Sequence, residues 1–334
     1  MINTIYIEEE ILDHPRTKVL IQRFANAKKI TCGRYTEIFN RKSQNFRLQK
    51  KNPALILAKK YENTILKAPD NYGIGAKHNY YFSHMLNCVY DCRYCFLQGM
   101  FQSANYVLFI NYEDFTNDIK TILKNHNNES VHFFSGYDCD SLALDSVSDF
   151  TKYFMPFFEI NPNSLIELRT KSTQIKSLLK ISSINNCVVA FSFTPSKISS
   201  ILEHKTPSVA RRLEAIVELQ KNGWQIGLRF DPLIYTKDFI IEYEELFETI
   251  FSKIDSDLLH SVSLGGFRLP KKYFRKIEKI YPDEILLTSP LIEKNNTVRY
   301  PDDIQDNMFS FCQKKIGQYI SLEKFFPCYN YEKI

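Results

Sequence analysis

Short apolar segments alternate with longer amphipathic segments between residues 78 and 266, and this alternation constrains the fold of the chain most strongly. The apolar segments predict six strands, at 79–86, 130–135, 164–170, 187–194, 224–231 and 260–265. The amphipathic segments between them predict helices at 112–125, 141–158, 172–182, 207–222 and 239–254. Strands separated by helices indicate a parallel α/β sheet with right-handed crossovers. Six such units predict an α/β fold of the partial (β/α)6 barrel type, with the active site at the carboxyl ends of the strands.

Two further regions flank this predicted barrel of residues 78–266. Residues 1–77 are expected to form a basic N-terminal region, because residues 16–68 are rich in lysine and arginine and contain only two glutamates and no aspartate. Such a region can lie along phosphates, and it can equally be a solvated helical face. A short helix is expected within it at 54–60. Residues 267–334 are expected to form a C-terminal extension.

The composition narrows the class of protein. The chain has 334 residues, 44% of them hydrophobic and 24% charged, so it can bury a sizeable core. No run of 18 apolar residues occurs, so we expect no membrane span and no membrane partner. The first residues lack the apolar core of a signal peptide, which favours the cytoplasm, where thiols stay reduced. The net charge of +5 permits a nucleic-acid partner without demonstrating one.

Three cysteines, Cys88, Cys92 and Cys95, follow the first expected strand with the spacing CxxxCxxC, and Tyr94 directly precedes the third. A compact loop can direct three thiolates at one centre, but three do not complete an ordinary four-cysteine iron–sulfur cluster. A [4Fe–4S] cube held by three thiolates leaves one iron open to a small molecule. S-adenosylmethionine (SAM) is the cofactor whose radical chemistry uses such an iron. The motif resembles the CxxxCxΦC signature of the radical SAM superfamily, in which Φ is aromatic.

A zinc site and scattered free thiols are the alternatives for these cysteines. Zinc normally needs a second pair of ligands, often CxxC or HxxxH, at a suitable distance. The chain has no second CxxC, and its five remaining cysteines are isolated, at positions 32, 139, 187, 312 and 328. The spacing therefore favours the iron–sulfur cluster.

Polar residues follow the strand expected at 130–135, where a barrel would have its mouth. Gly136 allows a close backbone turn there and is a candidate cofactor-binding residue. Asp140 or Ser141 can cap the next helix, and a helix amino terminus also suits a ligand carboxylate. A thiol at a barrel mouth is open to oxidation, so Cys139 indicates a chemical role.

Charged residues occupy the ends of two later expected strands. Lys171 follows the strand at 164–170, where its ammonium can pair with a carboxylate in the mouth or simply lie on the surface. Arg229 and Asp231 share one face of the strand at 224–231, so we expect them to pair inside the barrel. Asp231 is also a candidate cofactor-binding residue.

Taken in order, these motifs resemble the spore photoproduct lyase family. The matching segments are 88–98, 139–141, 169–171 and 207–215, and the likeness extends from about residue 78 to the carboxyl terminus. The resemblance implies a lyase that cleaves the methylene bridge between two thymines in ultraviolet-damaged DNA. It implies that a [4Fe–4S] cluster reduces SAM to a 5′-deoxyadenosyl radical, which takes a hydrogen atom from the lesion. An electron donor such as flavodoxin or ferredoxin is the partner expected to reduce the cluster.

The resemblance also implies roles for individual residues. Cys139 falls where the family has the thiol that returns a hydrogen atom to the product radical. Ser141 and Lys171 fall where the family holds the methionyl group of SAM. Tyr94 matches one of two tyrosines that pass the hydrogen onward, but the second of these is Phe96 here, which has no O–H. We therefore expect SAM to be consumed rather than recycled.

Two other functions remain open from the sequence. The chain can be a radical SAM enzyme that acts on another nucleic acid or on a small molecule, since residues 298–308 lack the glycine-rich, aromatic pattern of sporulation lyases. It can also be a non-enzymatic nucleic-acid-binding protein with a structural cluster. The segment 271–276 is basic with interleaved aromatic residues, which suits contact with DNA. The same segment can be an amphipathic helix that buries Tyr273, Ile277 and Ile280.

Overall fold

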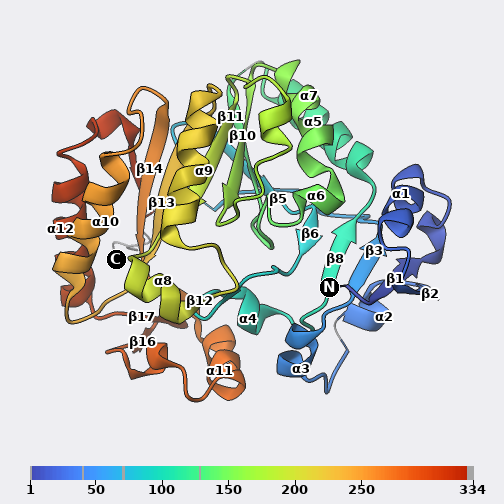
Figure 1. Ribbon diagram of the computed structural model, residues 1–334, viewed down its shortest axis with the longest axis horizontal. Coiled ribbons are helices and arrows are strands. Elements are labelled where there is room, and N and C mark those ends of the chain that lie inside the picture. The colour runs from blue at the N-terminus through green and yellow to red at the C-terminus, as the bar shows by residue number, and fades with distance from the viewer. Residues whose placement is uncertain (1, 40, 70–71, 128, 329–334) are drawn as a thin grey trace.

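The computed structural model describes residues 2–39, 41–69, 72–127 and 129–328 and centres on a curled eight-stranded sheet (Figure 1). The strand order is β18-β14-β13-β11-β10-β9-β5-β4, and all neighbours are parallel except β4, which runs antiparallel to β5. The strands are β4 (Ile65–Lys67), β5 (His78–Phe82), β9 (Val131–Ser135), β10 (Ser164–Thr170), β11 (Cys187–Ser192), β13 (Gln225–Leu233), β14 (Leu259–Gly266) and β18 (Phe325–Pro327). The six expected strands are neighbours in sequence order, which confirms the predicted α/β partial barrel.

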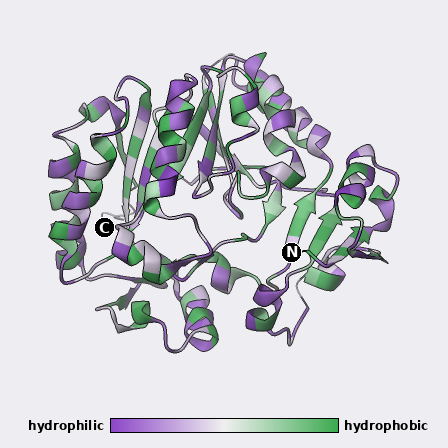
Figure 2. Cartoon of the chain, in the orientation of Figure 1, coloured by the Kyte–Doolittle hydropathy of each residue, from purple (hydrophilic) through white to green (hydrophobic). Residues whose placement is uncertain are grey.

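Helices cover the outer face of this sheet, where Figure 2 shows their polar sides turned to solvent and the strands mostly hydrophobic. They are α5 (Tyr112–Asn125), α7 (Phe150–Glu159), α9 (Val209–Lys221), α10 (Phe239–Phe251) and α12 (Asp302–Ile316). The helix predicted at 141–158 is divided into α6 (Asp145–Ser148) and α7, because Asp149 adopts a left-handed conformation with φ of 53°. No helix in the described ranges is both long and apolar enough to cross a membrane.

The helix predicted at 172–182 is wrong, since only a 3-10 turn, η2 (Leu178–Lys180), forms there. Hydroxyl groups compete with helix formation at its start. Thr170 Oγ1 accepts a hydrogen bond from the Ser172 N–H, and Ser172 Oγ accepts one from the Gln174 N–H. Such local bonds give the backbone an alternative to the helical pattern.

A second, five-stranded sheet lies beside the barrel at the right of Figure 1, in the order β2-β1-β3-β8-β6. Its strands are β1 (Thr4–Glu8), β2 (Lys28–Cys32), β3 (Leu55–Ala58), β6 (Met85–Leu86) and β8 (Tyr106–Phe109). The single strand predicted at 79–86 is therefore two strands in different sheets. The helix predicted at 54–60 is wrong, because β3 occupies it between β1 and β8 with all four side chains buried. A short apolar run without polar alternation fits a helix or a buried strand equally well.

The C-terminal extension packs against the segment that follows the three cysteines. Its helix α11 (Lys271–Ile280) contacts α4 (Leu97–Met100), and a Cβ on Gly99 would lie 2.4 Å from the Tyr273 carbonyl oxygen. A glycine is therefore required for this close approach. The helix buries Phe274 and Ile277. Of the three residues predicted to be buried, only Ile277 is fully buried, whereas Tyr273 and Ile280 are half-buried. The strands β15 (Arg268–Pro270), β16 (Ile292–Lys294) and β17 (Thr297–Arg299) form a small sheet beside it.

Candidate active site

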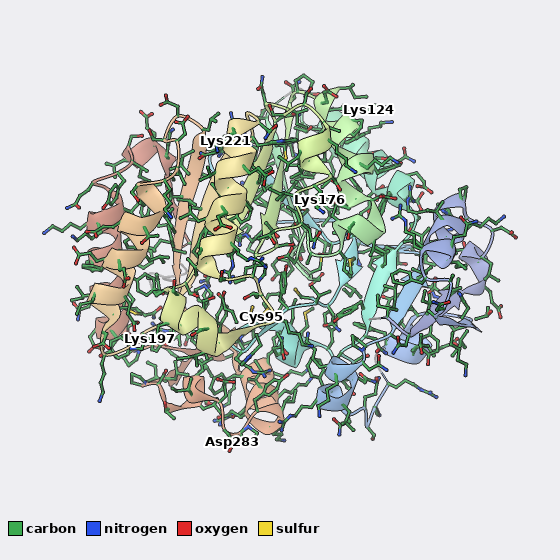
Figure 3. The ribbon with its side chains drawn as sticks, viewed as in Figure 1. Cys95, Lys124, Lys176, Lys197, Lys221 and Asp283 are labelled. Atoms are coloured by element: carbon green, nitrogen blue, oxygen red, sulfur yellow. The ribbon has the colours of Figure 1, made fainter. Side chains whose placement is uncertain are left out.

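The three motif cysteines lie on the connection between β6 and β8, near the centre of the molecule, where Cys95 is labelled in Figure 3. All three thiols are free. Cys92 belongs to β7 (Asp91–Cys92), which pairs antiparallel with β12 (Glu203–His204). Burial raises the pKa of Cys88 to about 12 and that of Cys92 well above its ordinary value, and the thiols act electrostatically on one another. Deprotonation of these buried thiols therefore requires a compensating positive centre such as a metal cluster.

This donor set suits a cluster better than a single metal ion. In the described part of the chain, no three His, Cys, Asp or Glu side chains converge on one point as a mononuclear site requires. Each thiolate of a [4Fe–4S] cube binds a different iron, so cube ligands need not converge in this way. Three free thiols spread around one loop fit such a cube.

The loop after β9 brings two predicted residues into contact. Gly136 has a φ of 81°, and a Cβ there would lie 2.5 Å from Ser141 Oγ, so only glycine fits. Ser141 is fully buried, with its Oγ 2.8 Å from Ser135 Oγ. Because Ser135 donates its hydrogen to the Glu167 carbonyl oxygen, Ser141 is the donor in this pair. Ser141 therefore keeps its lone pairs for a further donor.

Asp140 ties this loop to the end of β10. Its Oδ1 accepts hydrogen bonds from the N–H groups of Leu142 and Ala143 and from Thr170 Oγ1. Its Oδ2 accepts the Lys171 N–H at 2.7 Å. The predicted helix cap at Asp140 or Ser141 is wrong, because the next helix, α6, begins only at Asp145 and Asp140 instead stabilises the turn before it. The same carboxylate holds the segments of Ser141 and Lys171 together, as expected for residues at one mouth.

Cys139 lies in the same loop and is 8% exposed. Burial raises its pKa well above the ordinary thiol value, and Cys88, Asp138 and Asp140 raise it further. The thiol therefore keeps its hydrogen at neutral pH. A backbone hydrogen bond with Met85 places Cys139 beside β6, the strand that leads into the cluster loop.

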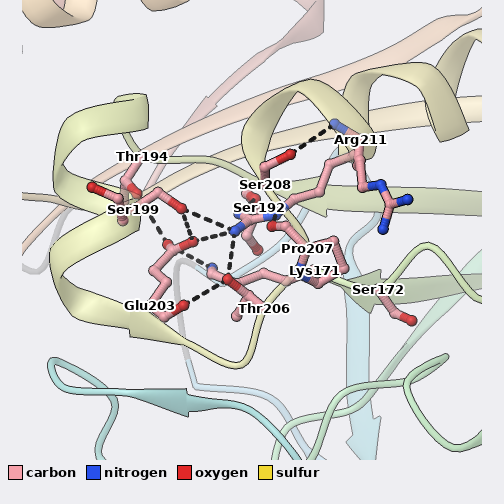
Figure 4. Close-up of polar contacts among 12 residues, drawn as sticks. Lys171, Ser172, Ser192, Thr194, Ser199, Glu203, Thr206, Pro207, Ser208 and Arg211 are labelled. Carbon is pink, nitrogen blue, oxygen red and sulfur yellow. Dashed lines mark hydrogen bonds and ion pairs between the residues drawn. The ribbon is translucent and has the colours of Figure 1, made fainter.

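Two residues that the sequence did not single out organise the other side of the site. The side chain of Glu203 is fully buried, and its Oε2 accepts from Ser199 Oγ at 2.8 Å (Figure 4) and from the Arg212 guanidinium. Its Oε1 accepts from the Tyr94 hydroxyl. Lys171 Nζ lies 3.7 Å from Glu203 Oε1. Burial alone would raise the pKa of Glu203, but Lys171 and Arg212 lower it to about 2. Arg212 belongs to the matching segment 207–215, which was the signal for this network.

The pair predicted between Arg229 and Asp231 is wrong. Arg229 Nη2 lies 2.7 Å from Glu167 Oε2, and both side chains are fully buried. Asp231 instead pairs with Arg268 at 3.2 Å and is 14% exposed. The two residues share a face of β13, but each side chain reaches a partner on a different element. Asp231 consequently lies nearer to solvent than Arg229.

Phe96 packs in an aromatic row that the sequence did not reveal. Its ring centroid lies 5.5 Å from that of Tyr137, which lies 4.5 Å from that of Tyr81. Tyr137 is 41% exposed and precedes Cys139 by two residues. The ring of a tyrosine therefore lies beside Phe96, which itself has no hydroxyl.

Comparisons with known proteins agree on one family. The family model described as spore photoproduct lyase matches residues 1–302. The spore photoproduct lyase of Clostridium acetobutylicum is 22% identical over 326 residues, covering 96% of this chain and 90% of that protein. The Bacillus subtilis lyase is 23% identical over 285 residues, covering 83% and 82%.

Solved structures give the same answer for the fold. A mutant spore photoproduct lyase with bound AdoMet and dinucleoside spore photoproduct superposes with a TM-score of 0.86 at 18% identity, over 98% of both chains. A spore photoproduct lyase complexed with dinucleoside spore photoproduct gives 0.84 over the same share. Radical SAM lyases of this family use SAM with a [4Fe–4S] cluster. The chain therefore belongs to the spore photoproduct lyase family, as its motifs predicted.

Proposed function

We propose that the chain repairs spore photoproduct, the methylene-bridged thymine dimer of ultraviolet-damaged DNA, with Cys88, Cys92 and Cys95 binding the cluster. The observation that carries this proposal is Cys139, a buried thiol in the loop after β9 that lies beside Met85 on β6, the strand leading into the cluster loop. When bound, the cluster and SAM supply a 5′-deoxyadenosyl radical. The residues of this chain bind SAM, position the lesion and return a hydrogen atom to the product.

Ser141 and Lys171 are the proposed ligands of the methionyl group of SAM. The Lys171 ammonium can pair with its carboxylate, and the free lone pairs of Ser141 Oγ can accept from its amino group. Glu203 keeps its bonds to Arg212 and Tyr94 if Lys171 turns towards the ligand. Gly136 leaves the space that Ser141 occupies, and Asp231 remains a proposed cofactor contact at the mouth.

Cys139 is the proposed hydrogen donor. A thiol S–H bond is weak enough to give its hydrogen atom to a carbon radical, so the S–H bond breaks, a C–H bond forms and a thiyl radical remains on Cys139. Burial keeps the thiol protonated for this step. We propose that Tyr94 takes part in passing the hydrogen onward, although its hydroxyl already donates to Glu203. Phe96 cannot take part, which supports consumption of one SAM for each repaired lesion.

The DNA backbone is proposed to contact α11. Lys271 and Arg275 already pair with Glu293, whereas the ion pairs of the described residues include none to Lys272 or Lys276. Burial and the nearby charge of Lys272 lower the pKa of Lys276, so two cations lie close together without an anion. A phosphate would relieve this repulsion. Residues 329–334 of the predicted extension lie outside the described residues.

We further propose that the enzyme works in the cytoplasm with a small acidic electron carrier, such as flavodoxin or ferredoxin. The exposed cation Arg47 on α3 (Phe46–Lys51) suits such a partner, because this helix lies against the cluster loop. The division of the chain into residues 1–77, 78–266 and 267–334 is also a proposal. Its first boundary does not separate the two sheets, because strands from both sides of residue 77 share the five-stranded sheet.

The experiment is anaerobic reconstitution with iron, sulfide, dithionite and SAM, followed by assay on an oligonucleotide that contains spore photoproduct. We expect 5′-deoxyadenosine together with two restored thymines, and neither product from Cys92→Ala. SAM cleavage without repair would favour the alternative of another substrate, which the departure at residues 298–308 supports. Absence of SAM cleavage in a chain with a full cluster would favour the non-enzymatic binding protein.

A further inference from the structure

Lys50 places a buried positive charge behind the cluster loop. It lies on α3 in the N-terminal region, 38 residues before Cys88 in the sequence, and is 6% exposed. Its Nζ donates hydrogen bonds to the Cys88 carbonyl oxygen at 2.9 Å and to the Tyr90 carbonyl oxygen at 3.0 Å. Both carbonyls belong to the segment that joins the first two motif cysteines.

This ammonium has no carboxylate partner among the described residues. The ion pairs found among the described residues include none to Lys50, and a buried unpaired charge is costly. Two carbonyl oxygens use two of its three N–H donors. The acidic groups that act on its charge are the motif thiols Cys88 and Cys95 and the carboxylate of Asp91, which itself pairs with Arg93. A buried cation in this position indicates an anion that the protein side chains alone do not supply.

A second contact holds the backbone of Lys50. Lys205 Nζ donates to the Lys50 carbonyl oxygen at 2.9 Å. Lys205 directly follows β12, the strand that pairs with Cys92 in β7. The N-terminal region, the cluster loop and the barrel therefore meet at this one residue.

We propose that Lys50 is a positioning residue for the [4Fe–4S] cluster, an inference that rests on the proposed cluster ligands. Its two hydrogen bonds fix the backbone between Cys88 and Cys92. Three thiolates outweigh the charge of an oxidised [4Fe–4S]2+ core, and reduction adds one more negative charge. The Lys50 ammonium opposes this charge and so favours the reduced state that must deliver an electron to SAM.

The test compares three variants after anaerobic reconstitution. Lys50→Met removes the charge and the donors at similar length, and Lys50→Arg keeps the charge. Lys51→Met is the matched control, because Lys51 is the next residue on α3 and is exposed. The readouts are iron and sulfide per chain and the midpoint potential of the cluster, followed by its electron paramagnetic resonance signal.

We expect Lys50→Met to shift the midpoint negative by an amount equal to about a tenfold change in the reduced-to-oxidised ratio, roughly 59 mV for one electron. Lys50→Arg should recover most of this shift, and Lys51→Met should show none. Loss of iron from Lys50→Met alone, with circular dichroism unchanged, would also support the positioning role. A full cluster with an unchanged midpoint in Lys50→Met would overturn it. Failure of the unaltered chain to bind iron would instead refute the cluster and the proposed function.

Discussion

The Lys171 ammonium lies 3.7 Å from Glu203 Oε1, the same oxygen that accepts a hydrogen bond from the Tyr94 hydroxyl. A lysine at a strand end and a tyrosine inside the cysteine motif thus share one acceptor, the carboxylate of Glu203 on β12. The proposed SAM ligand is thereby linked to the cluster loop. Lys171 also lies with its Nζ 5.7 Å from the centre of the Tyr94 ring. We expect a change at Lys171 to affect mainly SAM binding and a change at Glu203 to affect mainly the stability of the fold.

Substitution of Lys171 by alanine should weaken SAM binding. The variant loses a charge-assisted contact to the methionyl carboxylate, which is worth roughly 1.5–3 kcal/mol, or one to two orders of magnitude in Kd. Isothermal titration calorimetry on the reconstituted enzyme measures it. Lys176→Ala is the control, because Lys176 is exposed on the same connection. Equal SAM affinities for the two variants would show that Lys171 does not bind the cofactor.

Substitution of Glu203 by glutamine should destabilise the fold in a pH-dependent way. The folded pKa is lowered from 4.5 to about 2, so the carboxylate stabilises the chain above about pH 4.5 and this contribution is lost as the pH falls towards 2. The shift corresponds to about 3 kcal/mol. Denaturant unfolding should show that difference between the original chain and Glu203→Gln at pH 7, and a smaller one at pH 3.

Glu214→Gln is the control for this experiment, because Glu214 is exposed on α9. It should leave the free energy of unfolding nearly unchanged at both pH values. A loss of stability in Glu203→Gln that is the same at pH 7 and pH 3 would contradict the account, since it would not depend on the charge that Arg212 and Lys171 stabilise.

The aromatic row around Phe96 leads to a prediction about SAM use. The unaltered enzyme should form close to one 5′-deoxyadenosine for each repaired lesion, because Phe96 has no hydroxyl to pass a hydrogen atom. Phe96→Tyr should lower this ratio. Counting both products by liquid chromatography gives the ratio. Many repairs per SAM in the unaltered enzyme would contradict the prediction, and their loss in Tyr137→Phe would assign the role to the neighbouring tyrosine.

The α11 cations should set the salt dependence of DNA binding. Each phosphate contact contributes about −0.9 to the slope of log K against log salt on duplex DNA. Replacing both Lys272 and Lys276 by alanine should therefore reduce the steepness by up to about 1.8. Fluorescence anisotropy at several salt concentrations measures the slope. Lys124→Ala with Lys221→Ala, on the outer surface in Figure 3, should leave it unchanged. An unchanged slope in the α11 variant would place DNA elsewhere.

The sequence predicted features that depend on local pattern. The six barrel strands are short apolar runs between amphipathic helices, and the three cysteines lie within eight residues of one another. The segment at β3 was misassigned because four consecutive apolar residues carry no period that separates a helix from a buried strand. Its neighbours in the sheet come from distant parts of the chain, which local pattern does not encode.

The partners of buried charged residues could not be predicted from the sequence either, because they lie far away along the chain. Tyr94 and Glu203 are 109 residues apart, and Arg229 finds Glu167 at a separation of 62. Arg229 and Asp231 lie on one face of the same strand, which suggested that they form a pair. A side chain in a sheet can, however, contact a residue on the neighbouring strand as readily as a residue two positions along its own strand. Lys50 was one cation among many in a basic region until the fold brought it to Cys88.

The hydrogen donor is the centre of the account, and product analysis of Cys139→Ala tests it most directly. Mass spectrometry would follow the lesion-containing oligonucleotide with reconstituted Cys139→Ala, with the unaltered enzyme and with Cys32→Ala, a cysteine far away on β2, as controls. We expect Cys139→Ala to cleave SAM and consume the lesion but to give misquenched products, such as adducts with the reductant. Both controls should restore two thymines. A clean pair of thymines from Cys139→Ala would contradict the account and remove this thiol from the reaction.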